Sequence, residues 1–199
     1  MLTLYHSPRS RSTRILWLLE EIGEPYQVEY VTIRRQDGSG ARDPRNRHPD
    51  GKVPALVHGG RLVTESAAIC LYLSDSFPGA KLGPAAGDAK RGDYLTWLFY
   101  YAGEIEPVVA AKWKGETDRN PDAKAAYDAM ESRLRGALER GPYLLGAAFS
   151  AADVLVASAF QWARHVMPQG SAFDAYLSRI ASRPALQRAM QKDDAPISA

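Results

Sequence analysis

The first third of the chain alternates between the two hydrophobic periods that separate strands from helices. The run "LTLYH" at 2–6 is apolar and strand-like, and the apolar positions that follow recur at the spacing of one helical face as far as Gly23 and Pro25. The run "YQVEYVTI" at 26–33 then alternates as a strand does, which predicts a βαβ unit with a right-handed crossover. Further on, "VPALVHGGRLVT" predicts two short strands joined by a Gly59-Gly60 turn, and "ESAAICLYLSDSF" predicts a helix.

Strand signals stop after residue 77, where the Pro- and Gly-rich stretch "FPGAKLGPAAG" begins. The rest of the chain has helical period or composition at 91–113, 123–140 and 150–166, with two shorter helices expected in 172–192. We therefore predict three parts: an α/β domain over 1–77, a linker over 78–87 and an all-helical domain over 88–199.

Composition and charge exclude several classes of protein. Hydrophobic residues make up 45% of the chain and charged residues 24%, which is ordinary for a soluble globular protein. The 25 basic and 23 acidic residues are spread along the chain, whereas a nucleic-acid-binding protein concentrates its Lys and Arg. No apolar run reaches membrane-spanning length, and the first residues do not form a signal peptide. We expect no nucleic-acid or membrane partner and a cytoplasmic location.

Cysteine usage limits the chemistry that the protein can perform by itself. The single cysteine, Cys70, excludes an intrachain disulfide and a cysteine metal cluster, and we predict no metal site. The order strand, helix, strand, then helix, strand, strand, helix is that of the thioredoxin-like fold. Redox members of that fold carry Cys-x-x-Cys at the start of the first helix, but here that place is occupied by "SPRSRSTR" at 7–14. Dithiol chemistry by the protein's own residues is therefore excluded.

Four motifs resemble the glutathione S-transferase superfamily. They are "LYHSPRSRSTRILWLLEE", similar to the first strand, loop and helix of bacterial and fungal members, then "GKVPAL", "LVTESAAICLYL" and "FSAADVLVASAF". Together they cover nearly the whole chain. The resemblance implies a thioredoxin-like glutathione-binding domain followed by a helical bundle, glutathione as co-substrate, and a homodimer.

The resemblance also implies which residues bind glutathione. Pro54 would follow a cis peptide bond, and the backbone of Val53 would pair with the cysteinyl backbone of glutathione like an added strand. Ser66, in the first turn of a helix, would bind the γ-glutamyl carboxylate, while Glu65 would take the ammonium group. Lys52 is the first candidate for the glycine carboxylate, followed by His48 and Arg47. Simple helix capping by Glu65-Ser66 and a solvated irregular helix and loop over 34–52 are the structural alternatives.

The motif "SAADV" at 150–154 resembles the capping motif of the family's central core helix. Ser150 would cap the helix, and Asp153 three residues later would reach back to it, as in a capping box. The helix that follows is apolar almost all round, so we expect it to be buried. A role in catalysis is not expected for this Ser-Asp pair.

The resemblance places the thiol chemistry in the "SPRSRSTR" loop. A free thiol titrates near pH ~8.5, so a transferase needs a hydrogen-bond donor and a helix N-terminus to hold the thiolate. Ser10 falls where serine-type members place their catalytic serine, and Ser12 is the second choice because it could instead cap the helix. Tyr5 is expected to be structural or to line the site. Whether Arg9 and Arg11 face the sulfur or the solvent stays open.

An aromatic stripe on the first long helix of the second half is the candidate site for a hydrophobic electrophile. It comprises Tyr94, Trp97, Tyr100, Tyr101 and Glu104, with Trp113 farther along and Trp162 or His165 as neighbours. A stripe at helical spacing is also typical of a core or a dimer interface.

Three functions are compatible with these residues. The first is a glutathione transferase that attacks an electrophile with the glutathione thiolate. The second keeps the same site for glutathione-dependent reduction of a disulfide or a peroxide. The third is a non-catalytic interaction or regulatory protein with this fold, which the retained glutathione contacts disfavour.

Overall fold

The computed structural model of the protein describes residues 1–194 and divides into two compact units. Within the described residues, the first unit comprises 1–73 together with 183–194, and the second unit comprises Ser74–Ser182. The fold is a thioredoxin-like domain with a four-stranded mixed sheet, followed by a helical domain. The division differs from the predicted boundaries at its end, because the last helix packs in the first unit and not with the helical bundle.

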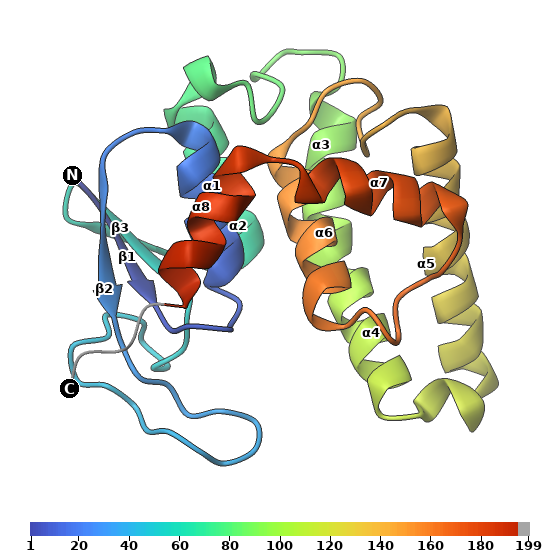
Figure 1. The fold of residues 1–199 in the computed structure, drawn as a ribbon, viewed down its shortest axis with the longest axis horizontal. Helices are drawn as coiled ribbons and strands as arrows, with labels where there is room; N and C mark the ends of the chain where they lie inside the picture. The colour runs from blue at the N-terminus through green and yellow to red at the C-terminus, as the bar shows by residue number, and fades with distance from the viewer. Residues whose placement is uncertain (195–199) are drawn as a thin grey trace. The chain divides into compact units, whose positions relative to one another are not determined.

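The sheet of the first unit has the strand order β2-β1-β3-β4 (Figure 1). Strand β1 (Leu2–His6) pairs in parallel with β2 (Tyr26–Tyr30) and antiparallel with β3 (Ala55–His58), and β3 pairs antiparallel with β4 (Arg61–Thr64). The parallel pair is the predicted βαβ unit. Gly59 and Gly60 both have positive φ, 55° and 81°, which the tight two-residue hairpin turn requires.

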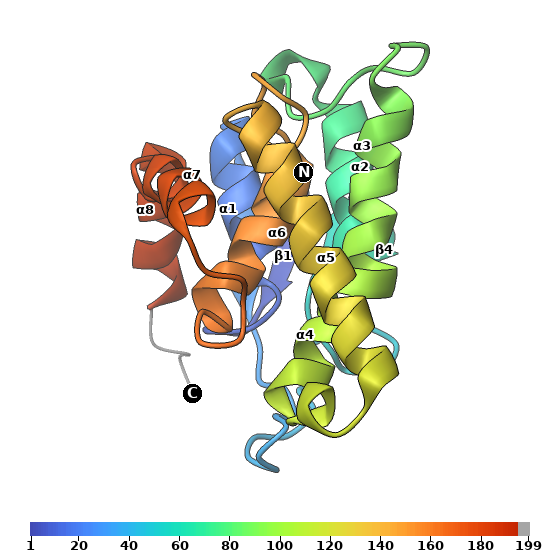
Figure 2. The same cartoon turned by 90° about the vertical axis from the view of Figure 1, so that its right-hand side faces the viewer.

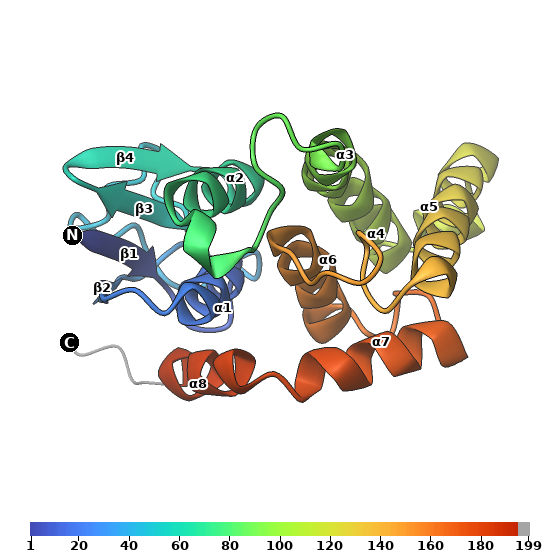
Figure 3. The same cartoon turned by 90° about the horizontal axis from the view of Figure 1, so that it is seen from above.

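Three helices complete the first unit: α1 (Thr13–Ile22), α2 (Ser66–Ser76), which crosses into the second unit at its end, and α8 (Pro184–Asp193). Helices α1 and α2 cover one face of the sheet, and α8 lies beside α1 (Figure 3). The apolar stripe of α1 is buried from Ile15 to Leu19, and the helix ends at Gly23, which has a φ of 77°. Ion pairs between Arg188 and Glu20 and between Arg183 and Glu21 join α8 to α1.

The second unit is a bundle of helices: α3 (Arg91–Tyr100), α4 (Glu106–Trp113), α5 (Pro121–Arg140), α6 (Ala151–Trp162) and α7 (Ser171–Ala181). Short 3₁₀ turns occupy Pro78–Ala80 and Glu116–Asp118. Helix α3 packs against α6, and α5 packs against α4 and α7 (Figure 2). The sequence predicts one helix over 91–113, but a π-helical turn at Tyr101–Ile105 separates α3 from α4.

Helix α6 is the core of the second unit. All its residues from Ala151 to Phe160 are buried, as its apolar composition predicts. Ser150 and Asp153 form the predicted capping box. The Asp153 carboxylate also accepts hydrogen bonds from the Leu144 amide at 2.9 Å and from the Tyr176 hydroxyl at 3.3 Å. Burial raises the pKa of Asp153 to about 6, although these hydrogen bonds favour its ionised form.

Across residues 1–194, the chain contains no helix that is both long enough and apolar enough to cross a membrane.

Candidate functional site

The strand register brings the sequence-predicted glutathione residues to one end of the sheet. Tyr5 of β1 pairs with Ala55 of β3, and Ala55 pairs with Thr64 of β4. The loop that follows β1, the Val53-Pro54 pair that precedes β3 and the Glu65-Ser66 pair that follows β4 therefore share this end. The N-termini of α1 and α2 start there as well, at Thr13 and Ser66. Two helix N-termini at one edge favour the binding of negative charge.

The two candidate catalytic serines differ in exposure. Ser12 is fully buried, and its hydroxyl oxygen accepts the Ser7 amide hydrogen at 3.1 Å. Ser10 is half-buried, and its hydroxyl lies 2.6 Å from the Ser7 carbonyl oxygen and 2.8 Å from the Ser12 hydroxyl. Ser12 is at the N-cap position of α1 but its side chain makes no cap hydrogen bond, so capping does not account for it. Only Ser10 combines exposure with a position at the helix start.

A buried histidine and aspartate stand behind the serines. The Nδ1 atom of His6 lies 2.8 Å from the Ser12 hydroxyl, and its Nε2 atom lies 3.2 Å from Asp193 Oδ1. Asp193, near the end of α8, also accepts hydrogen bonds from the Thr13 hydroxyl at 2.6 Å and from the Arg9 amide at 3.1 Å. Burial acts to raise the pKa of Asp193, but the hydrogen bonds from His6, Thr13 and Arg9 outweigh it and lower that pKa below its usual value.

The Val53-Pro54 peptide bond is cis, as the resemblance implies. Both residues are buried, and Val53 is 7% exposed. Among residues 1–194, neither the amide nor the carbonyl of Val53 has a hydrogen-bond partner. An extended peptide backbone could therefore pair with Val53 without displacing an existing bond.

Glu65 and Ser66 lie at the start of α2. Glu65 is exposed and has a left-handed φ of 67°, and its carbonyl accepts the Ile69 amide hydrogen at 2.9 Å, so it precedes the first helical residue. Ser66 is half-buried, and its hydroxyl has no hydrogen-bond partner in the part of the chain that the structure describes. That hydroxyl is available to a carboxylate at the helix N-terminus.

The helix expected between the second and third strands is not formed: the basic segment 34–52 contains no helix, and it brings one buried histidine to the site. His48 is 4% exposed, and its Nδ1 accepts the Asp50 amide hydrogen at 3.1 Å, so a neutral ring carries its proton on Nε2. Glu65 acts on the His48 ring electrostatically, which places the two close together. Lys52 is 72% exposed and lies 3.5 Å from Asp50, whereas Arg47 is exposed.

His48 makes the stability of the protein depend on pH. Burial lowers the pKa of His48 below its usual value, and the charge of Asp50 only partly opposes this. The folded state then binds fewer protons than the unfolded state, so the contribution is complete above pH ~6.5 and is lost as the pH falls through the folded-state pKa. We expect the urea midpoint of the native protein to fall more between pH 7 and pH 5 than that of His48→Gln. Parallel curves for the two proteins would contradict this.

Both arginines of the loop have exposed side chains, so the structure does not direct either into the protein interior. The backbone of Arg9 has a left-handed φ of 54°, and its amide is the donor to Asp193.

Tyr5 is half-buried within β1.

The candidate electrophile residues of the second unit separate into buried and exposed groups. Trp97 and Tyr101 are 7% and 1% exposed, and the Tyr101 hydroxyl donates to Glu106. Tyr100 is half-buried, with the Arg133 guanidinium 4.0 Å from its ring centre. Glu104 is exposed in the π-helical turn. Buried rings pack the bundle, so Trp97 and Tyr101 have little surface to offer a ligand.

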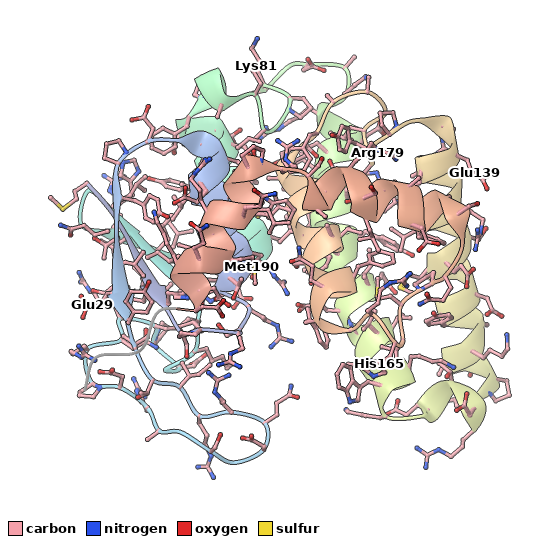
Figure 4. All side chains as sticks on the ribbon, in the orientation of Figure 1. Glu29, Lys81, Glu139, His165, Arg179 and Met190 are labelled. Atoms are coloured by element: carbon pink, nitrogen blue, oxygen red, sulfur yellow. The ribbon has the colours of Figure 1, made fainter. Side chains whose placement is uncertain are left out.

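The exposed member, Trp113, belongs to an aromatic cluster with Trp162 and His165. The Trp113 ring is stacked 5.6 Å from that of Trp162 and makes an edge contact at 4.3 Å with His165. Trp113 and Trp162 are 51% and 42% exposed. Figure 4 shows His165 on the segment after α6, beside α4.

Neither a protein thiolate nor a metal cluster is available in the described part of the chain. Burial raises the pKa of the Cys70 thiol to about 12, so it stays protonated at neutral pH. No group of three or more His, Cys, Asp or Glu side chains within residues 1–194 is arranged to hold a metal ion.

Sequence reasoning missed His6, Thr13 and Asp193. One signal pointed to His6: it continues the alternation of Leu2 and Leu4, so a polar ring falls on the buried face of β1. No signal pointed to Asp193, which comes to the loop only because α8 packs beside α1.

The chain resembles known proteins in both sequence and fold. The family model for the glutathione S-transferase N-terminal domain matches residues 8–76, and the model for the C-terminal domain matches residues 115–192. Glutathione S-transferase GstA of Escherichia coli O157:H7 is 26% identical over 196 residues, covering 96% of this chain and 98% of the relative. A glutathione transferase structure from Methylococcus capsulatus has a TM-score of 0.81 at 29% identity, covering 97% of this chain and 98% of the other. A sphingomonad glutathione S-transferase complexed with glutathione has a TM-score of 0.76 at 28% identity, covering 96% and 98%.

Proposed function

The chain belongs to the glutathione S-transferase superfamily, and we propose that it is a glutathione transferase that holds the thiolate of glutathione with the Ser10 hydroxyl. The observation that carries this proposal is the half-exposed Ser10 hydroxyl at the N-terminus of α1, at the same end of the sheet as the unpartnered Val53 backbone. A hydroxyl donor and a helix N-terminus both favour a negatively charged sulfur.

Glutathione would lie along the end of the sheet. Val53 would pair with its cysteinyl backbone beside the cis Pro54. Ser66 and the N-terminus of α2 would take the γ-glutamyl carboxylate, with Glu65 on the ammonium group. Neutral His48 would donate its Nε2 hydrogen to the glycine carboxylate, and Lys52 would add a screened charge from the surface. The glutathione bound by the sphingomonad relative supports this use of the fold.

The electrophile would be a flat, apolar molecule. The Trp113–Trp162 stack offers exposed aromatic faces, and His165 and Glu104 supply polar groups in the same unit. Tyr100 completes the set, while Trp97 and Tyr101 would support it from the core. A cytoplasmic homodimer is part of the proposal; Phe99 on α3, 66% exposed, is the kind of apolar side chain that a dimer interface covers.

Ser66 tests the binding half of the proposal. Native protein should bind glutathione in calorimetry, and Ser66→Ala should weaken binding about 10- to 100-fold, because a hydrogen bond to a charged group contributes about 1.5–3 kcal/mol. Ser76→Ala, which changes the exposed last residue of the same helix, is the matched control and should bind like the native protein. Absence of heat with the native protein would overturn the proposal in favour of an interaction module.

Measured turnover with three acceptors tests the proposed transferase activity. A chloronitrobenzene, a hydroperoxide and a mixed disulfide present three acceptors to the same thiolate. We expect the chloronitrobenzene to react fastest. Faster reduction of the hydroperoxide or the disulfide would reassign the reaction, and no turnover with any of the three would refute an enzymatic role.

A further inference from the structure

Four side chains form a continuous polar chain from the surface of the first unit to its interior. The Ser10 and Ser12 hydroxyl oxygens are 2.8 Å apart, the Ser12 hydroxyl is 2.8 Å from His6 Nδ1, and His6 Nε2 is 3.2 Å from Asp193 Oδ1. Ser10 is half-buried, but the other three are at most 1% exposed. This series of four side chains therefore begins at Ser10, which a ligand can reach, and ends at the buried carboxylate of Asp193.

The Ser10 hydroxyl hydrogen has two acceptors within reach in the ligand-free protein. It donates to the Ser7 carbonyl oxygen at 2.6 Å, and the Ser12 hydroxyl oxygen lies 2.8 Å away. The Ser12 oxygen accepts the Ser7 amide hydrogen. With the ring hydrogen of His6 on Nε2, which lies at ion-pair distance from Asp193 without an aligned hydrogen bond, Ser12 can donate to Nδ1. Rotation of the Ser10 hydrogen from the Ser7 carbonyl to Ser12 then points both hydroxyl hydrogens toward the histidine.

We propose that His6, held by Asp193, is the base that receives the thiol proton of glutathione through Ser10 and Ser12. This inference rests on the proposed function. The thiol S–H passes its proton to the Ser10 oxygen, Ser10 passes its own to Ser12, and Ser12 passes its own to His6 Nδ1. Three O–H or N–H bonds form while one S–H and two O–H bonds break, so no proton is gained or lost. The products are a thiolate and an imidazolium.

The transfer reverses the two hydrogen bonds that join Ser10, Ser12 and His6, while the Nε2 hydrogen stays toward Asp193. His6 Nδ1–H now donates to Ser12, Ser12 donates to Ser10, and Ser10 donates outward to the thiolate that it has created. The hydroxyl that delivers the proton inward is thus left in the orientation that stabilises the product. A serine beside a histidine and a carboxylate is the arrangement by which hydroxyls are activated in other enzymes.

The surroundings of His6 suit a transient positive charge. Asp193 on α8 supplies the negative charge that a buried imidazolium needs, and Thr13 and the Arg9 amide keep its carboxylate in place. Tyr30 on β2, which is also titratable, makes an edge contact with the ring at 5.5 Å. Burial and the nearby charge of Asp193 raise the pKa of Tyr30, so it stays neutral. Asp193 is accordingly a positioning residue, which acts through His6.

Proton release on glutathione binding tests the relay. In weakly buffered solution at pH 7, a pH indicator counts released protons while the thiolate absorbance counts thiolates. We expect the native protein to release close to none per thiolate, because the proton stays on His6. In His6→Asn the asparagine amide can still hydrogen-bond to Ser12, but it cannot accept a proton at pH 7. This variant should therefore release about one proton to the solution for each thiolate formed. His58→Asn, which changes the half-buried histidine of β3, should behave like the native protein.

The native protein provides a test that needs no substitution. NMR of the His6 ring nitrogens should show an imidazolium with glutathione but a neutral ring with S-methylglutathione, which lacks the thiol proton. A ring in the same state in both complexes would refute the relay, as would one proton released per thiolate by the native protein. Both of these results require that glutathione binds. If the proposed function is wrong, neither glutathione nor S-methylglutathione binds, so the two cases can be told apart.

Discussion

Ser10→Ala is expected to raise the pKa of the bound glutathione thiol by about one to two units and to lower kcat/KM at pH 7 about 10- to 100-fold. The reason is that Ser10 is the half-exposed hydroxyl of the loop, whereas Ser12 is fully buried behind it. Titration of the thiolate absorbance gives the pKa directly. The loss of turnover should shrink as the pH rises above the new thiol pKa, since the thiolate then forms without the hydroxyl.

Two variants make the Ser10 result specific. Ser10→Thr keeps the hydroxyl and should retain most of the activity, while Ser76→Ala removes an exposed serine from α2 and should change neither the pKa nor the rate. If Ser10→Ala left both quantities unchanged, the assignment of Ser10 to the thiol would be wrong. The same titration in Ser12→Ala would then identify the inner hydroxyl as the donor.

Asp153→Ala is expected to lower the free energy of unfolding by about 3–5 kcal/mol. The substitution leaves the Leu144 and Ser150 amides, both buried, without their acceptor, and a backbone amide cannot turn to find another. The Tyr176 hydroxyl loses the same partner. Urea unfolding followed by circular dichroism measures the change. Asp174→Ala, on the exposed first turn of α7, is the control and should cost less than about 0.5 kcal/mol.

The pH dependence of Asp153→Asn separates its charge from its hydrogen bonds. Asparagine has one acceptor oxygen, so one of the two amides still loses its partner, and we expect roughly half the cost of the alanine variant. A folded-state pKa of about 6 lies above the usual value of 3.8, so this contribution to stability is complete below pH 3.8 and is lost as the pH rises through about 6. The difference in free energy of unfolding between the native protein and Asp153→Asn should therefore shrink as the pH rises from 3.8 to above about 6. A constant difference would show that Asp153 stays ionised throughout.

The elements that the sequence predicted well are those with a strong local signal. Alternation and the Gly59-Gly60 turn located β1, β3 and β4, and the apolar stripe ending at Gly23 located α1. Only the first part of the 26–33 run became β2, which ends at Tyr30 where its pairing with β1 ends. The π-helical turn at Tyr101–Ile105 escaped prediction, because an extra residue in a helical turn leaves the composition helical.

The site residues also separate into those that local motifs identified and those whose roles depend on the folded structure. Motifs pointed to Ser10, Val53, Glu65 and Ser66, and the sheet register places all of them at one end of the first unit. The resemblance ranked Ser10 above Ser12, but it could not show that Ser12 is fully buried, because burial is a property of the folded loop. The aromatic stripe could not be divided into core and surface for the same reason.

The sequence by itself determined the order of the four strands and the absence of a protein dithiol, because each depends on residue type and local spacing, and its motifs carried the resemblance to the glutathione S-transferase superfamily. Only the tertiary structure decided what stands behind the serine loop. His6 and Asp193 are 187 residues apart in the chain, and they meet because the apolar faces of α1 and α8 pack together and carry the carboxylate to the end of β1. Contacts over such separations depend on the packing of whole elements, which no local pattern encodes.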